Sequence, residues 1–325
     1  MSENSAQIYS ATPGPALSVD AVLRDELAHG DALIGTIAPI LRHLLANDEH
    51  SVFSDEIIAR VRGMMGDVAR QLLNQLAIAN DEPDTRDHDP AHIAALIDGL
   101  VTHTGFLSHV HALALEWQLT ERLQARLALD PVLSPLLQAL IASSDAQVAA
   151  AAMAMLAAQA RFAQAQRRMQ LPLSELPGDL LYAALLGLRG LTSAGGEAQL
   201  AEAEQAIRRS YDENRTRLGL IARLVTGMGG GATAALSITH AGAGMFLSAL
   251  ALASGQDRDM AVLATNEGQL ARLALALRAS GVKPHGIEEQ FVALHPDVAL
   301  PDGFEQLSSD QAAALLARSA AYPGS

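Results

Sequence analysis

Residues 145–169 read DAQVAAAAMAMLAAQARFAQAQRRM, and this stretch decides the fold class. Alanine fills most positions from 149 to 160, and alanine loses less free energy than other residues when it enters a helix. The same bias runs through the whole chain, which is 50% hydrophobic but only 3% aromatic. Strands recruit β-branched and aromatic residues instead. The composition therefore predicts an all-α protein.

Length and charge narrow the class further. A chain of 325 residues exceeds the ~250–300 residues at which single cores stop growing, so two helical lobes are expected. The net charge of −14 argues against nucleic acid as a partner, because clustered Lys and Arg supply most of that affinity. The absence of cysteine excludes disulfides and thiolate chemistry and is typical of a reducing, cytoplasmic compartment.

The pattern along the chain predicts three parts. Residues 1–17 lack the cationic start and apolar core of a signal peptide and are expected to form a disordered lead. Residues 18–128 are acidic and predict a helical bundle. Residues 129–322 have the texture of paired antiparallel helices with short breaks, which predicts a HEAT-like array.

The first lobe is expected to begin with two helices. One covers residues 19–28, and Asp31 is a suitable N-cap for a second that runs to residue 45. Pro39 is expected to kink or divide this second helix, since proline has no N–H to donate.

The next helix carries the clearest apolar stripe of the lobe. Ser54 is its predicted cap, and Glu56 and Arg60 are expected to pair at i,i+4 on its solvent side. Gly63 and Gly66 lower its helix propensity, which predicts close approach of a neighbouring helix. The stripe consists of Ile57, Val61, Met64, Val68, Leu72 and Leu76.

Two later helix starts have strong local signals. Asp89 is a favoured cap residue and Pro90 suits the first helical position. Ser308 and Gln311 have the spacing of a capping box. Between them, the longest helix is predicted over residues 197–225.

Two i,i+4 pairs are expected to line the solvent side of that longest helix. They are Glu204 with Arg208, and Glu213 with Arg217. An ordinary solvated face explains such pairs as well as a binding surface does.

The order of helices over residues 232–295 carries a resemblance. An apolar helix, a short helix, the segment GQLARLALALRASGV at 268–282 and a further helix follow one another. This order resembles the closing part of an alphaproteobacterial helical-repeat family of unknown function. The resemblance implies HEAT-like packing, has no diagnostic motif and implies no functional residues.

Residues 224–256 carry no fixed charge and are long enough to span a bilayer. Glycines interrupt the stretch, so two shorter buried helices are the preferred interpretation, with reversible membrane association as an alternative. Within it, residues 227–232 fit the relaxed dinucleotide pattern G-x-G-x-x-A. A helix precedes the pattern where a strand is required, so no cofactor is expected.

His109 and His111 are the histidines with the most interesting placement. They are two apart, which on a helix separates them by about 200°, so they do not form a metal-binding pair and no metal site is expected. An exposed histidine on a helical bundle can also accept a phosphoryl group from a partner's aspartate. A two-component phosphotransfer module using either residue is therefore an alternative function.

No catalytic constellation occurs in the sequence, so a non-enzymatic role is expected. The favoured hypothesis is a cytoplasmic protein–protein interaction or regulatory scaffold whose partner is an unidentified protein, with a homodimer left open and no membrane or nucleic acid expected. Arginines of the middle section could form a basic stripe facing an acidic partner, or could dock the acidic first lobe within the molecule. The favoured contacts are Arg161, Arg167, Arg168, Arg208, Arg215 and Arg217.

Overall fold

Helices account for the regular structure of the chain in the computed structural model, which describes residues 18–46, 55–81, 88–191 and 196–319. No strand occurs in these residues, so the predicted all-α class is confirmed. Their α-helices are α1 (Val19–Ala46), α2 (Asp55–Ala79), α3 (Pro90–Thr102), α4 (Thr104–Leu127), α5 (Pro135–Ile141), α6 (Ala146–Arg167), α7 (Gly178–Leu191), α8 (Glu197–Ser210), α9 (Arg217–Gly227), α10 (Ile238–Ser254), α11 (Arg258–Leu263), α12 (Leu270–Ala279), α13 (Pro284–Leu294) and α14 (Ser309–Arg318).

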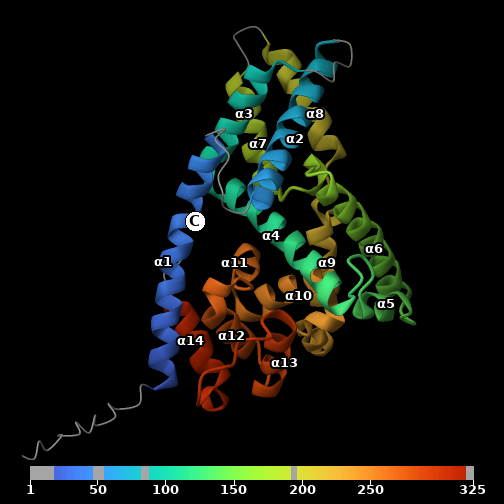
Figure 1. The fold of residues 1–325 in the computed structure, drawn as a ribbon. Helices are drawn as coiled ribbons and strands as arrows, with labels where there is room; N and C mark the ends of the chain where they lie inside the picture. The colour runs from blue at the N-terminus through green and yellow to red at the C-terminus, as the bar shows by residue number, and fades with distance from the viewer. Residues whose placement is uncertain (1–17, 47–54, 82–87, 192–195, 320–325) are drawn as a thin grey trace, which may run out of the picture.

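The buried apolar side chains form two clusters, and most of the helices that build one lie above those that build the other in Figure 1. The upper cluster is built by α2, α3, α7 and α8. The lower cluster is built by α5, α6 and the helices from α9 to α14. Burial of these apolar faces supplies the main force that holds the helices together.

Two helices belong to both clusters. In α4, Phe106 and Val110 are buried in the upper cluster, whereas Leu119 and Leu123 are buried in the lower one. The long helix α1 likewise contributes to the lower cluster near its start and to the upper cluster near its end. Each cluster therefore contains residues from both sides of the expected boundary at 128/129, and the boundary stays a prediction. The expected disordered lead, residues 1–17, lies outside the described residues.

The first helix differs from the expectation of two helices with a cap at Asp31. The structure has one continuous α1 that passes through both Asp31 and Pro39. Tertiary contacts explain the difference, because the Asp31 carboxylate forms an ion pair with Arg272 and accepts a hydrogen bond from Ser319. The carboxylate thus ties α1 to the C-terminal helices instead of capping a helix start.

The second helix has the predicted stripe, which is buried in the upper cluster except for the partly buried Leu76. Ser54, its predicted cap, lies outside the described residues. Glu56 and Arg60 pair as expected, with Nη2 of Arg60 2.6 Å from the carboxylate, but Arg60 is buried where a solvent position was expected. Its Nη1 donates a hydrogen bond of 2.6 Å to the backbone oxygen of Gln166, which joins α2 to α6.

The predicted helix over residues 197–225 is wrong. The chain breaks between α8 and α9, where Tyr211 is extended and donates its hydroxyl to the Leu176 carbonyl at 2.8 Å. Thr216 then caps α9 by accepting a hydrogen bond from the Gly219 amide at 3.0 Å. The break turns Arg217 inward, so the expected pair with Glu213 on a solvent face does not form.

The uncharged stretch 224–256 forms the 3₁₀ segment η3 (Gly229–Leu236) and α10, which is buried on nearly all sides. Helix α10 contacts α4, α5, α9, α11, α12 and α13, so it lies at the centre of the lower cluster. A helix that is apolar all round is expected in such a central position. The HEAT-like arrangement of the surrounding pairs stays a prediction.

Among the described helices, none is by itself both long and apolar enough to cross a bilayer, although two bent pairs pass on length and composition. These pairs are α3 with α4, bent by 96°, and η3 with α10, bent by 111°.

Candidate functional site

A cluster of buried and half-buried charged side chains joins α4, α9 and α11. Glu116 is fully buried there, and its carboxylate accepts hydrogen bonds from Nη1 and Nη2 of Arg217 at 2.8 and 2.9 Å. Nη2 of Arg258 donates to the same carboxylate at 2.8 Å. We call Glu116, Arg217 and Arg258 the central charge cluster.

Neighbouring groups fix the geometry of this cluster. Arg217 stacks over the ring of Phe162, with its guanidinium carbon 3.7 Å from the ring centroid. Gln159 accepts a further hydrogen bond from Arg217 at 3.3 Å. Gly244 leaves the necessary space, because a Cβ there would come within 2.9 Å of Nη1 of Arg217.

The electrostatics of the cluster favour one protonation state. Burial alone raises the pKa of Glu116, but the adjacent charges of Arg217 and Arg258 outweigh it and lower the pKa to about 2. The carboxylate is therefore ionised at neutral pH and saturated with donors. Such a group joins elements of the fold, here α4, α9 and α11, and is a poor general acid.

Of the six predicted contact residues, one is buried and five are exposed. Arg217 is only 2% exposed, and it pairs with Glu116 on α4 instead of facing a partner. The five exposed arginines are Arg161, Arg167, Arg168, Arg208 and Arg215.

These five arginines do not align as one stripe. Helix α8, which carries Arg208, packs against α2, whereas α6 packs against α5 and α9. Arg167 lies over the ring of Trp117, with its guanidinium carbon 5.8 Å from the centroid. The arginines that remain near one another are Arg161 and Arg167 on α6 and Arg168 just after it.

The two histidines considered for phosphotransfer are not exposed acceptors. His109 is 4% exposed, and burial lowers the pKa of His111 to about 4 although Asp259 opposes the shift. A histidine that accepts a phosphoryl group must be reachable by the phosphorylated aspartate of a partner domain. The buried His109 does not meet this requirement. Across the residues that the structure describes, no group of three or more histidine or carboxylate side chains converges as a metal site would.

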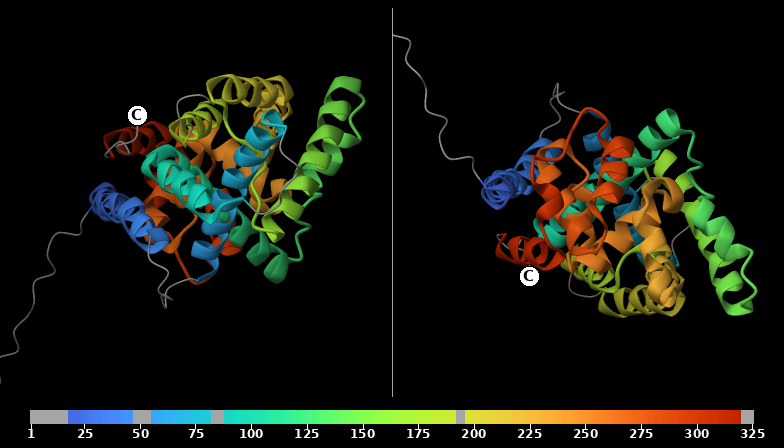
Figure 2. Two further views of the ribbon diagram at one scale, coloured as in Figure 1. Left: turned by 90° about the horizontal axis from the view of Figure 1, so that it is seen from above. Right: turned by 90° about the horizontal axis from the view of Figure 1, so that it is seen from below.

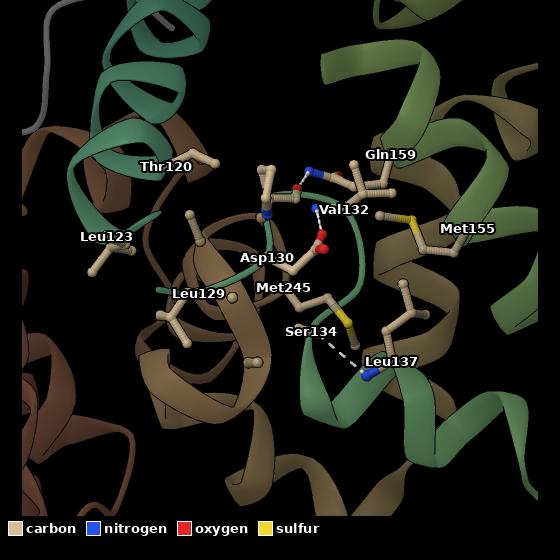
Figure 3. Close-up of a pocket in the computed structure, with 15 residues that line it drawn as sticks. Thr120, Leu123, Leu129, Asp130, Val132, Ser134, Leu137, Met155, Gln159 and Met245 are labelled. Carbon is tan, nitrogen blue, oxygen red and sulfur yellow. Dashed lines mark hydrogen bonds between the residues drawn. The ribbon is translucent and has the colours of Figure 1, made fainter. Parts of the chain in front are cut away.

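A small cavity of about 30 Å³ lies between the end of α4, α5, α6 and α10 (Figure 3). Its polar groups serve the connecting loop: Asp130 accepts from the amides of Val132 and Leu133 at 2.7 and 2.9 Å. Gln159 donates to the Pro131 carbonyl at 2.9 Å. The space is enough for one or two waters, so this cavity belongs to the packing of the loop.

A larger hollow opens between α6 and α9, with a volume of about 710 Å³. We call it the α6–α9 groove. Its walls are mostly apolar, and Arg223 is the charged residue among them. The apolar lining residues are Leu140, Val148, Ala150, Ala151, Ala154, Leu224, Gly227 and Met228.

The outer face of α6 is unusual for a surface helix. Residues 146–160 contain no charged side chain, and the outward positions include Ala150, Ala154 and Met153, which is 51% exposed. A helix at the surface of a globular protein normally presents charged and polar residues outward. Figures 1 and 2 show α6, in green, along one edge of the molecule.

Sequence reasoning missed both the central charge cluster and the α6–α9 groove. Glu116 offered a signal, since it is an isolated charge inside the apolar run HALALEWQL at 111–119. A lone carboxylate in such a run predicts a buried partner, because an unpaired buried charge is costly. The alanine-rich stretch by itself predicts only helix, and helix propensity does not describe what lies against the outer side of α6.

No family model, no curated protein and no solved structure matches this chain. Its function is therefore inferred from its own residues.

Proposed function

We propose that this protein is a protein–protein interaction module that receives an apolar or amphipathic helix of a partner protein in the α6–α9 groove. The observation that carries the proposal is the uncharged outer face of α6 beside that groove. Helices that bind in grooves present apolar side chains at i, i+3, i+4 and i+7, and a groove with apolar walls matches such a stripe.

The composition of the groove supports this kind of ligand. Its walls carry alanine, leucine, valine and methionine, and small alanine side chains let a second helix approach α6 closely. Met228 adds a flexible side chain that can adapt to the partner. The binding energy would come from apolar area removed from water, at about 25 cal/mol per Å².

The charges near the groove indicate which partner surface fits. Arg223 lines the groove, and all charged side chains within α6 are arginines, Arg161 and Arg167. A partner helix with acidic residues beside its apolar stripe would place them near these cations. Such complementarity at the rim affects specificity and the association rate more than affinity.

A charge placed on the outer face of α6 tests the proposal. A photo-crosslinking residue at position 154 is expected to capture a defined protein in the native host, and Met153→Glu in the same protein should reduce that capture at least tenfold, which corresponds to about 1.4 kcal/mol. The reason is that an unpaired charge buried in an apolar interface loses its hydration.

Val292→Glu is the matched control, because Val292 is 66% exposed and lies on α13, away from the groove. It should leave the capture unchanged. Equal effects of Met153→Glu and Val292→Glu, with both variants folded, would contradict the proposal. Light scattering of the purified protein distinguishes the remaining case, in which the captured partner is a second copy of this chain.

A further inference from the structure

The two methionines of α6 differ in exposure although they are two positions apart. Met153 is 51% exposed, whereas Met155 is 2% exposed and packs in the lower cluster. Residues two apart on a helix point about 200° away from each other, which explains the contrast. Within the described residues, the thioether of Met153 is the one that solvent reaches most freely. The other described methionines are buried or half-buried, namely Met64, Met65, Met169, Met228, Met245 and Met260.

Short side chains surround Met153 on the surface of α6. Residues three and four apart are neighbours on a helix, and at these distances from Met153 lie Ala149, Ala150 and Ala157. Because an alanine side chain ends at Cβ, these neighbours do not extend far enough to shield the methionine sulfur. The stretch 146–160, whose midpoint is Met153, contains no charged residue. Met153 is thus an accessible thioether at the centre of an uncharged helix face.

The proposed function depends on this same face. Ala154, the next residue, lines the α6–α9 groove, and Met228, directly after α9, adds a half-buried thioether to the groove wall. A thioether contributes to such a surface only while it is apolar, because its contribution comes from apolar area removed from water. A chemical change that makes the sulfur polar would therefore weaken binding at this face.

Hydrogen peroxide makes this change by converting methionine to its sulfoxide. The sulfur lone pair attacks one peroxide oxygen, the O–O bond breaks, and the departing hydroxide takes up the proton of the transferred hydroxyl group. The products are methionine sulfoxide and water, so the sulfur loses two electrons and the peroxide gains them. The flexible apolar side chain becomes a polar, chiral one.

We propose that Met153 is a redox-sensitive modification site, and that its oxidation by peroxide closes the α6 face to the partner. The sulfoxide oxygen requires hydrogen-bond donors, and the neighbouring alanine side chains offer none, so burying it against an apolar helix costs free energy. Methionine sulfoxide reductases restore the thioether, which makes the change reversible. This regulation rests on the proposed function because it acts on the same face, whereas the site of oxidation does not depend on it.

Oxidation of the full-length protein by hydrogen peroxide locates the site. Cleavage after arginine releases residues 127–161 as one peptide that contains both Met153 and Met155, and tandem mass spectrometry assigns the added oxygen to one of them. Met153 should be oxidised at least about tenfold faster than Met155, because susceptibility follows exposure. In urea, where the fold no longer protects Met155, the two rates should become similar. Equal rates in the folded protein would overturn the assignment.

Binding is measured on protein that is oxidised at Met153 and not at Met155. Purified protein with the photo-crosslinking residue at position 154 is treated briefly with peroxide, freed of peroxide and illuminated in an extract of the native host. The yield of the crosslinked adduct should fall at least about tenfold relative to the untreated protein. Treatment of the oxidised protein with methionine sulfoxide reductases should restore the yield.

Met153→Leu is the matched control, because leucine keeps an apolar side chain of similar volume and has no sulfur. It should form the adduct like the parent protein and keep forming it after peroxide treatment. A parent protein that is oxidised selectively at Met153 and still forms its adduct would overturn the switch and leave the proposed function intact. No adduct from the untreated parent would instead overturn the proposed function, and the switch with it.

Discussion

At the scale of single residues, Glu116 makes the stability of the protein depend on pH. Its pKa of about 2 lies below the ordinary value of 4.5, because Arg217 and Arg258 outweigh the effect of burial. A lowered pKa stabilises the folded state above pH 4.5, and this contribution is lost as pH falls from 4.5 towards 2. Glu116→Gln should therefore lower the free energy of unfolding by about 3–5 kcal/mol at neutral pH, since both arginines lose their counter-charge.

Urea unfolding at neutral pH and near pH 3 measures this effect. The deficit of Glu116→Gln relative to the parent should shrink at the lower pH, because the parent has lost part of the same contribution. Glu289→Gln is the control, since Glu289 is exposed and its ion-pair partner, His285, is exposed as well. It should change the free energy of unfolding by less than about 0.5 kcal/mol at either pH. A deficit that stays constant with pH would show that the pKa of Glu116 is the same in the folded and unfolded states, so that the two arginines do not lower it.

The candidate site was only partly predictable from residues. Exposure of Arg161 and Arg168 follows from their place at the end of an apolar helix, and the structure has them exposed. Arg217 was misplaced because the pattern Glu213 to Arg217 has the spacing of a helical surface pair, and spacing cannot reveal that a break precedes α9. Tertiary partners 101 residues away, such as Glu116, leave no periodic signal.

At the scale of elements, Gly63 shows how α2 packs against the end of α6. A Cβ at position 63 would lie 2.6 Å from Cβ of Met169, so a close approach is found here, made by the segment after α6 and not by a helix as predicted. Gly63→Ala should destabilise the protein by about 1–3 kcal/mol, as overpacking does, although alanine is the better helix former. Thermal and urea unfolding measure the change.

Gly99 on α3 provides the matched control. A Cβ there meets nothing within 4 Å, so Gly99→Ala should stabilise the protein by about 0.5–1 kcal/mol through helix propensity alone. A stabilising Gly63→Ala would mean that α2 and the Met169 segment are further apart than described. At Gly66 the predicted close approach of a neighbouring helix is not found. The atoms nearest to a Cβ placed there belong to Arg70 of the same helix.

Local signals predicted elements well, and distant contacts explain the errors. Asp89 and Ser308 cap α3 and α14 as predicted, since a cap depends on residues within one turn. At Asp31 the same kind of signal failed, because the ion pair with Arg272 uses the carboxylate elsewhere. Boundaries set by contacts more than 200 residues away are not encoded in a local pattern.

At the scale of the whole molecule, the shared helices predict that the two clusters unfold together. Helices α1 and α4 have buried side chains in both clusters, and Glu116 on α4 is paired with α9 and α11. A substitution that weakens the packing of one cluster should therefore also lower the stability of the other. Two independent lobes that meet at 128/129 would instead unfold one at a time.

Phe246→Ala tests this coupling, because Phe246 is fully buried in the lower cluster and its truncation costs about 3–5 kcal/mol. Amide hydrogen exchange is expected to accelerate by the same factor in α2 of the upper cluster and in α12 of the lower one, since both would open only in the global transition. Phe246→Leu should give a smaller but equally parallel change. Normal protection of α2 in Phe246→Ala, with α12 deprotected, would show that the two clusters are separate folding units.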